Sequence, residues 1–176
     1  MPAKEPSAWS GEKPLLMVDI DGVISLFGFN PHALPDGSFH TIDGIPHYLS
    51  RIAAAHLLAL AEHFDLVWCS GWEEKAEEHL PHLLALPAGL PFLRFERGVG
   101  GTGSTNAHWK LDAIDTYVDG RPLAWIDDAF NDACHTWAQE RSAPTLLVQT
   151  DPAVGLTSKE ESLLGSWARE LSPARV

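Results

Sequence analysis

The stretch PLLMVDIDGV, residues 14–23, decides how this chain folds. It is a short apolar run that ends abruptly at Asp19 and Asp21, and Gly22 follows at once. A strand buried on both faces of a parallel sheet has a continuous apolar sequence, and it stops where the chain reaches the edge of the sheet. The stretch therefore predicts a buried parallel strand with two carboxylates at its carboxyl end.

The rest of the chain repeats this pattern in alternation with helices. Further apolar runs predict strands at residues 64–69, 91–95, 123–126 and 145–149. Apolar residues at helical spacing predict helices at residues 48–63, 73–86, 106–118, 129–141 and 157–171. Thr157 and Glu160 form a capping-box pattern that marks the start of the last helix. The alternation predicts an α/β, three-layer, Rossmann-like fold with a central parallel five-stranded sheet and helices on both faces.

Two segments break the alternation, and a third precedes it. Residues 1–13 are expected to form a flexible tail, and residues 14–176 a single domain. Residues 25–46 are rich in Gly, Pro, His and Asp, and they predict a small hairpin flap. Residues 96–105 are rich in glycine and predict a loop.

The composition restricts where the protein works and what it binds. Lys and Arg number 12 against 24 Asp and Glu, so the formal net charge is −12. Such a surface repels polyanions, so a phosphate ligand needs a local site with a metal ion or a few focused cations. No apolar run approaches the roughly 20 residues that cross a bilayer, and the first residues lack the order of a signal peptide. We expect a cytoplasmic protein that does not enter a membrane.

Polar residues follow the predicted strands where ligands bind in open α/β sheets, beyond the carboxyl ends. Ser70 and Gly71 follow the second run, Asp127 and Asp128 follow the fourth, and Lys110 lies in the segment before it. Four carboxylates at one edge are costly unless they are paired, and a divalent cation with oxygen ligands relieves their repulsion. With a lysine and a hydroxyl beside them, they predict a magnesium site suited to phosphoryl transfer.

This order of motifs resembles the four motifs of the haloacid dehalogenase (HAD) superfamily, over residues 15–132. More narrowly, the chain is similar to the HAD domain of bacterial RNA-repair (Swiss Army Knife) proteins, in the segments 67–72, 123–128 and 155–157. The resemblance implies the HAD fold, capless or with a small flap, and a phosphatase that uses Mg²⁺.

The resemblance also implies a role for each motif residue. Asp19 would be the nucleophile that forms an aspartyl-phosphate, and Asp21 the general acid and then the general base. The implied catalytic residues are Asp19, Asp21, Ser70 and Lys110. The implied substrate-binding residues are Ser70, Gly71 and Lys110. The implied metal ligands are Asp19, Asp21 through its backbone carbonyl, Asp127 and Asp128.

Several alternatives stay open. A response-regulator receiver uses similar residues, but its acidic pair comes first and its lysine last, whereas here the Asp19–Asp21 motif comes first, Ser70 second and the acidic pair last. A HAD-like module that binds phosphate and Mg²⁺ without catalysis is a second alternative. Asp132 either supports the site or is a solvated acid, and Trp72 either stacks on a ligand or packs in the core.

The substrate and the oligomeric state are not fixed by the sequence. An open, capless site and the similarity to a repair domain point to a terminal phosphate on a nucleic acid. The net charge and the absence of a basic stripe favour a small phosphate ester, closed over by the flap at residues 25–46.

Overall fold

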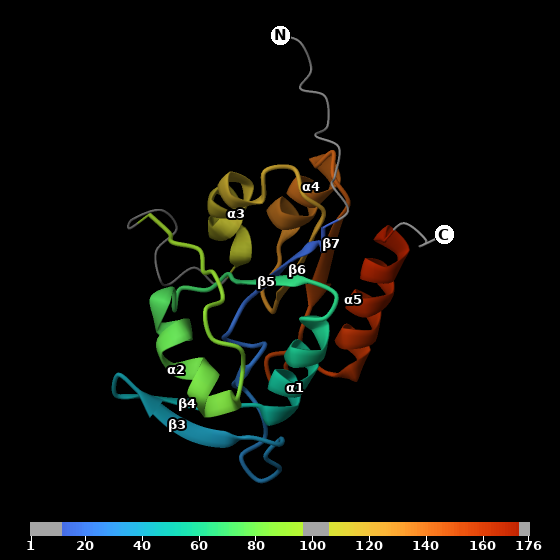
Figure 1. The fold of residues 1–176 in the computed structure, drawn as a ribbon. Helices are drawn as coiled ribbons and strands as arrows, with labels where there is room; N and C mark the ends of the chain where they lie inside the picture. Colours follow the sequence, from blue (N-terminus) through green and yellow to red (C-terminus); the bar gives the residue numbers. More distant parts are fainter. Residues whose placement is uncertain (1–11, 97–105, 173–176) are drawn as a thin grey trace.

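The central layer is a parallel sheet with strand order β5-β1-β6-β7. The computed structural model describes residues 12–96 and 106–172, and Figure 1 shows how their helices and strands are arranged. The strands are β1 (Leu15–Val18), β5 (Asp65–Trp68), β6 (Leu123–Asp127) and β7 (Thr145–Gln149). β1 and β6 form the inner pair, with Leu15 opposite Leu123 and Val18 opposite Ile126. The motif residues after these two strands therefore emerge side by side at one edge of the sheet.

The fifth predicted strand, at residues 91–95, is reduced to a single bridge, so that prediction was wrong in the number of strands. Phe92 bridges to Trp68 on β5, through hydrogen bonds that use the Pro91 carbonyl and the Leu93 N–H. Pro91 has no N–H to extend the ladder in one direction. In the other direction the Phe95 N–H donates to the Glu73 carboxylate and so does not extend the ladder with β5.

Helices cover both faces of the sheet, which confirms the predicted α/β fold. The first face carries α1 (Arg51–Leu60), α2 (Glu74–Leu84) and α5 (Ser158–Leu171). The second carries the 3₁₀ turn η1 (Ala107–Lys110), α3 (Leu111–Val118) and α4 (Asp132–Glu140). Alternate residues of β1 serve the two layers: Leu16 and Val18 pack into the first cluster, and Leu15 and Met17 into the second. None of the helices in the described residues is long and apolar enough to cross a membrane.

Some helix boundaries differ from the prediction. The first helix was expected to begin at Tyr48, but Tyr48 and Leu49 belong to a strand and pair with neighbouring strands. Helix α1 begins after Ser50, whose hydroxyl accepts a hydrogen bond from the Ala53 N–H at 3.0 Å. The capping box predicted at Thr157 is confirmed, because the Glu160 carboxylate accepts the Thr157 N–H at 2.9 Å.

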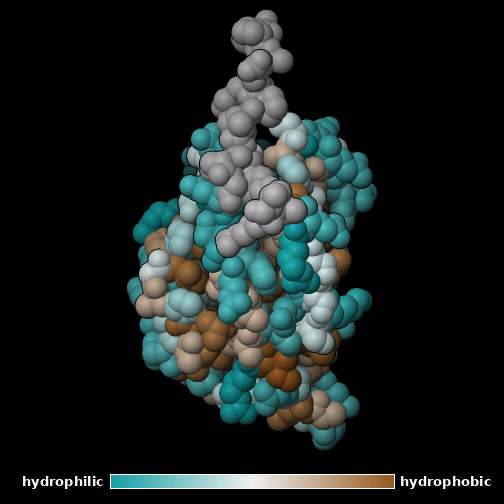
Figure 2. All heavy atoms as spheres, turned by 45° about the vertical axis from the view of Figure 1, so that its right-hand side comes forward, coloured by the Kyte–Doolittle hydropathy of each residue, from teal (hydrophilic) through white to brown (hydrophobic). Residues whose placement is uncertain are grey.

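Residues between β1 and α1 form the flap, a three-stranded antiparallel sheet. Its strands are β2 (Ser25–Leu26), β3 (Ser38–Ile42) and β4 (Ile45–Leu49), in the order β2-β4-β3. Asp43 and Gly44 make the turn between β3 and β4, and both have positive φ, as a tight hairpin requires. Figure 1 shows the flap at the lower end of the molecule, beneath α1 and α2. The face in Figure 2 is mostly hydrophilic, and its hydrophobic side chains gather in the lower half.

The predicted tail and the predicted glycine-rich loop fall largely outside this description. Residues 1–11 and 97–105 are not among the described residues.

Candidate active site

The turn after β1 sets the geometry of the site. Asp19 extends the strand pair, because its N–H donates to the Ile126 carbonyl at 3.1 Å, and its side chain is buried. The chain then reverses at Gly22, which has φ +83°. A Cβ at this position would lie 2.5 Å from Cγ of Asp128. Only glycine fits both constraints, so Gly22 allows the loops after β1 and β6 to meet.

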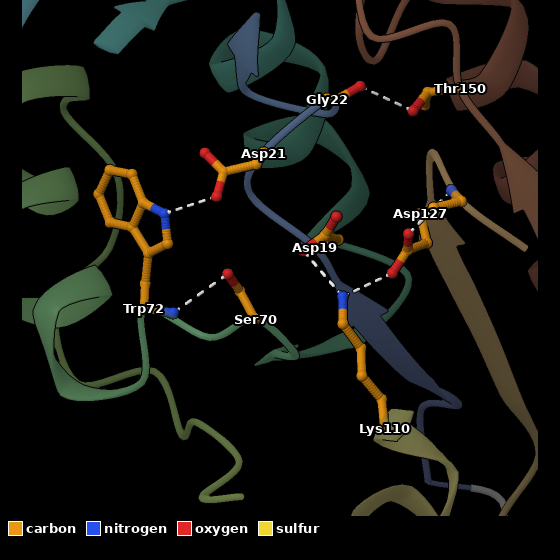
Figure 3. Close-up of polar contacts among 9 residues, drawn as sticks. Asp19, Asp21, Gly22, Ser70, Trp72, Lys110, Asp127 and Thr150 are labelled. Carbon is orange, nitrogen blue, oxygen red and sulfur yellow. Dashed lines mark hydrogen bonds and ion pairs between the residues drawn. The ribbon is translucent and has the colours of Figure 1, made fainter. Parts of the chain in front are cut away.

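Lys110 lies between two of the predicted acids. Its Nζ donates to Oδ1 of Asp19 at 2.9 Å and to Oδ2 of Asp127 at 2.6 Å, and all three side chains are buried (Figure 3). Burial alone lowers the pKa of Lys110, but the charges of Asp19 and Asp127 outweigh it, and the net pKa is raised. The lysine is therefore a fixed ammonium at the end of η1.

Three carboxylates surround a common point. Asp19, Asp127 and Asp128 each offer an oxygen, and these oxygens lie within 4.8 Å of one another. Burial raises the pKa of Asp19, and the neighbouring Asp127 adds to this against the opposing effect of Lys110. Burial and Asp127 also raise the pKa of Asp128 to about 6. One ammonium does not balance three carboxylates, and clustered hard oxygen donors are the set that fits Mg²⁺.

Ser70 and Gly71 lie at the end of β5 and line the same cleft. Ser70 is buried, and its hydroxyl accepts a hydrogen bond from the Trp72 N–H at 3.3 Å. Because it is the acceptor in that bond, the hydroxyl can still donate its own hydrogen to a ligand. Gly71 is exposed at the cleft surface beside it. The pair is placed to contact an anion next to Lys110.

Asp21 lies apart from the buried acids, at the rim of the cleft. Its carboxylate is 53% exposed and, among the described residues, is not part of the three-acid cluster. The Trp72 indole N–H donates to its Oδ2 at 3.0 Å (Figure 3). Nδ1 of His47, on the flap, lies 3.8 Å from Oδ1, and the His47 ring packs edge-on against Trp72. Asp21 is therefore held between the flap and the β5 loop.

Sequence comparison agrees with this arrangement. The family profile described as the HAD domain in Swiss Army Knife RNA repair proteins matches residues 15–160. The chain belongs to this family. No curated protein matches the sequence.

The match runs from the start of β1 into α5, so this HAD domain includes the flap and every motif residue named above. Membership in the superfamily suggests a hydrolase of the phosphatase type. HAD enzymes typically use Mg²⁺, which agrees with the acidic cluster.

Two contacts in the HAD domain were not foreseen from the sequence. Trp72, expected to stack on a ligand or to pack in the core, is partly buried against the core, and its indole N–H also contacts Asp21. Thr150, buried after β7, donates through its hydroxyl to the Gly22 carbonyl at 2.8 Å (Figure 3). Thr150 directly follows the last predicted strand, and this position in the sequence could have indicated that it lies near the site. Asp132, the ambiguous acid, is exposed at the first turn of α4 and does not line the cleft.

The site opens into a cleft of ≈ 960 Å³ between the strand ends and the flap. The acids, Ser70 and Lys110 form its polar part. Apolar and aromatic side chains form much of the rest, from Phe27, Ile42, Ile45, Trp72, Phe95, Trp109 and Phe130.

Proposed function

We propose that this HAD domain is a Mg²⁺-dependent phosphatase that cleaves phosphate monoesters through an aspartyl-phosphate on Asp19. The observation that carries the proposal is the Lys110 ammonium, fixed between the carboxylates of Asp19 and Asp127 with a third acid beside them. A buried nucleophile next to a fixed cation and a metal-binding oxygen cluster is suited to phosphoryl transfer.

Each residue has a defined part in the proposed reaction. An Asp19 oxygen attacks phosphorus, and the bond from phosphorus to the leaving oxygen breaks. Asp21 gives its proton to that oxygen. Asp21 then accepts a proton from water, the water oxygen attacks phosphorus, and the bond to Asp19 breaks. Ser70 and Lys110 hold the phosphoryl oxygens during both steps.

Mg²⁺ would lower the repulsion between the anionic nucleophile and the anionic substrate. Asp19 and Asp128 have the most available oxygens for it, together with the Asp21 carbonyl that the family resemblance implies. Asp127 already accepts from Lys110 through Oδ2 and from the Ala129 N–H through Oδ1 at 3.0 Å. We therefore propose that Asp128 binds the metal directly and that Asp127 acts mainly by holding Lys110.

Two substrate classes follow from different observations. The family description names RNA repair, which supports a terminal phosphate on a nucleic acid. The net charge of −12 supports a small phosphate ester instead.

The test is hydrolysis of p-nitrophenyl phosphate with and without Mg²⁺. We expect activity that chelation abolishes, and a loss of at least about 1,000-fold in kcat for Asp19→Asn, because the amide is not a nucleophile. Asp132→Asn removes an acid of the same type outside the cleft and should stay within about twofold of the parent. Full activity in Asp19→Asn would show that the assigned nucleophile is wrong.

Metal binding can be followed without turnover. Mg²⁺ should raise the unfolding midpoint of the parent protein, because a ligand that binds only the folded state stabilises it. The rise should be much smaller in Asp128→Asn. An equal rise in both proteins would contradict the assignment of Asp128.

A further inference from the structure

The flap presents exposed apolar side chains to the cleft. Phe27 is 49% exposed and Ile45 is 58% exposed, and both line the cleft together with the buried Ile42. Phe27 follows β2, where its N–H donates to the Pro152 carbonyl, and Ile45 pairs with Ile42 across the hairpin turn. Large apolar side chains left open beside a reaction centre mark a surface that contacts a ligand.

The other elements around the cleft add aromatic rings. Trp109 precedes Lys110, lies across the edge of Phe95 with ring centroids 4.6 Å apart, and is only partly buried. The Lys110 Nζ lies 5.6 Å from the centre of the Trp109 ring. This indole therefore lies close to the cation that we propose binds the phosphoryl group. Rings of this kind take up flat, apolar groups by stacking.

The charges in the cleft do not favour a second anionic group. Within residues 12–96 and 106–172, the lysines that line it are Lys75 and Lys110. Lys110 is shared by two acids, and Lys75 is paired with Asp43 at the tip of the flap. Glu96 adds further negative charge to the lining, as does Glu73, whose carboxylate lies 3.7 Å from the Arg94 guanidinium. A second phosphate of a substrate would meet carboxylates there.

We propose, on the basis of the phosphatase function above, that the substrate is a phosphate monoester with a single anionic group and a flat aromatic ring. The phosphate lies at Lys110 and Ser70, and the ring lies against Phe27 and Ile45 of the flap. A mononucleotide has this chemistry. A nucleic-acid strand has the ring but carries further phosphates, so it is the poorer substrate.

Matched substrates separate the two parts of the proposal. A nucleoside 5′-monophosphate and ribose 5-phosphate have the same scissile bond and differ at C1′, where the nucleotide carries its base and ribose 5-phosphate a hydroxyl. We expect kcat/KM to be at least about tenfold higher for the nucleotide, the gain from burying part of one ring. A 5′-phosphorylated oligonucleotide should be poorer than the mononucleotide at low salt and should improve as salt screens the repulsion. Equal rates for nucleotide and ribose 5-phosphate, or an oligonucleotide that is best at low salt, would overturn the inference.

Variants of the flap test whether its apolar side chains cause the preference for the nucleotide over ribose 5-phosphate. In Phe27→Ala/Ile45→Ala, the preference for the nucleotide over ribose 5-phosphate should fall to within about twofold. Phe39→Ala removes a ring that is 62% exposed on the same flap but does not line the cleft, so the preference should stay. A preference that survives the double variant would contradict the assigned surface. If the parent protein hydrolysed no ester at all, the proposed phosphatase function would be wrong. Equal turnover of all esters would reject only the proposed substrate class.

Discussion

The two sides of the cleft differ in the chemistry and the burial of their side chains. On the side of the strand ends, the charged side chains of Lys110, Asp19 and Asp127 are buried, and Lys110 is held by both acids. On the side of the flap, apolar side chains such as Phe27 and Ile45 are exposed, and the ion pair between Lys75 and Asp43 lies at the surface. In the proposed reaction, the strand ends bind the phosphate that all phosphate esters share, and the flap contacts the part of the ester in which they differ.

The difference between the strand ends and the flap follows from the cost of burying charge. A buried charge is stable only with fixed partners, so the side chains at the strand ends have little freedom to change. Exposed apolar side chains on a hairpin have few such constraints, and their replacement costs little stability. Substitutions at the strand ends should therefore affect folding and chemistry together, whereas substitutions in the flap should affect the choice of substrate.

The largest expected effect comes from comparing the two lysines. Lys110→Met leaves Asp19 and Asp127 buried without their cation, and we expect a loss of about 3–5 kcal/mol in the free energy of unfolding. Lys75→Met removes an exposed ion pair and should leave the unfolding midpoint unchanged within error. Chemical denaturation of both variants measures the contrast.

Mg²⁺ provides a second test of the difference between the two lysine variants. Added Mg²⁺ should restore part of the stability lost in Lys110→Met, because the unpaired carboxylates then have another cation. Equal stability of the two lysine variants in the absence of metal would show that the buried network contributes no more than a surface pair.

The sequence predicted the strand ends better than it predicted the flap. The residues after β1, β5 and β6 were placed correctly at one edge, because an apolar run ending in polar residues is a local signal. Tyr48 and Leu49 were assigned to a helix because their apolar spacing fits either structure, and only pairing with β2 and β3 makes them a strand. A hydrogen bond such as that from Trp72 to Asp21 joins residues 51 positions apart, which no local pattern reveals.

A smaller effect is expected at the glycines of the two regions. Gly22→Ala forces a methyl group against Asp128 at positive φ, and we expect a loss of about 2–4 kcal/mol together with weakened Mg²⁺ binding. Gly44→Ala, at φ +79° in the flap turn, has nothing within 4 Å of the new methyl group. Its cost should be only about 1 kcal/mol, from the backbone alone. Denaturation and metal titration of the two variants give the comparison, and equal losses would argue against the contact with Asp128.

The smallest effect is expected at Trp72, where the two regions meet. Trp72→Phe removes the indole N–H that holds Asp21, and we expect kcat to fall about fivefold to tenfold for alkyl phosphates. The fall should be less for p-nitrophenyl phosphate, whose leaving group needs little protonation.

A tryptophan outside the cleft lining provides the control. Trp137→Phe breaks a similar bond, from its indole to Asp115 at 2.8 Å, between two residues that do not line the cleft, and should leave both rates unchanged. If Trp72→Phe slowed all esters equally, Trp72 would have a packing role and would not position the acid.

The inner strand pair has a consequence for synthesis of the protein. Lys110 and Asp19 are 91 positions apart, and β1 has no partner on its β6 side until residues 123–127 have been made. A nascent chain that ends before residue 123 therefore carries Asp19, the proposed nucleophile, without the neighbouring acids Asp127 and Asp128. Under the proposed mechanism, ester hydrolysis begins only after the strand that bears Asp127 has left the exit tunnel.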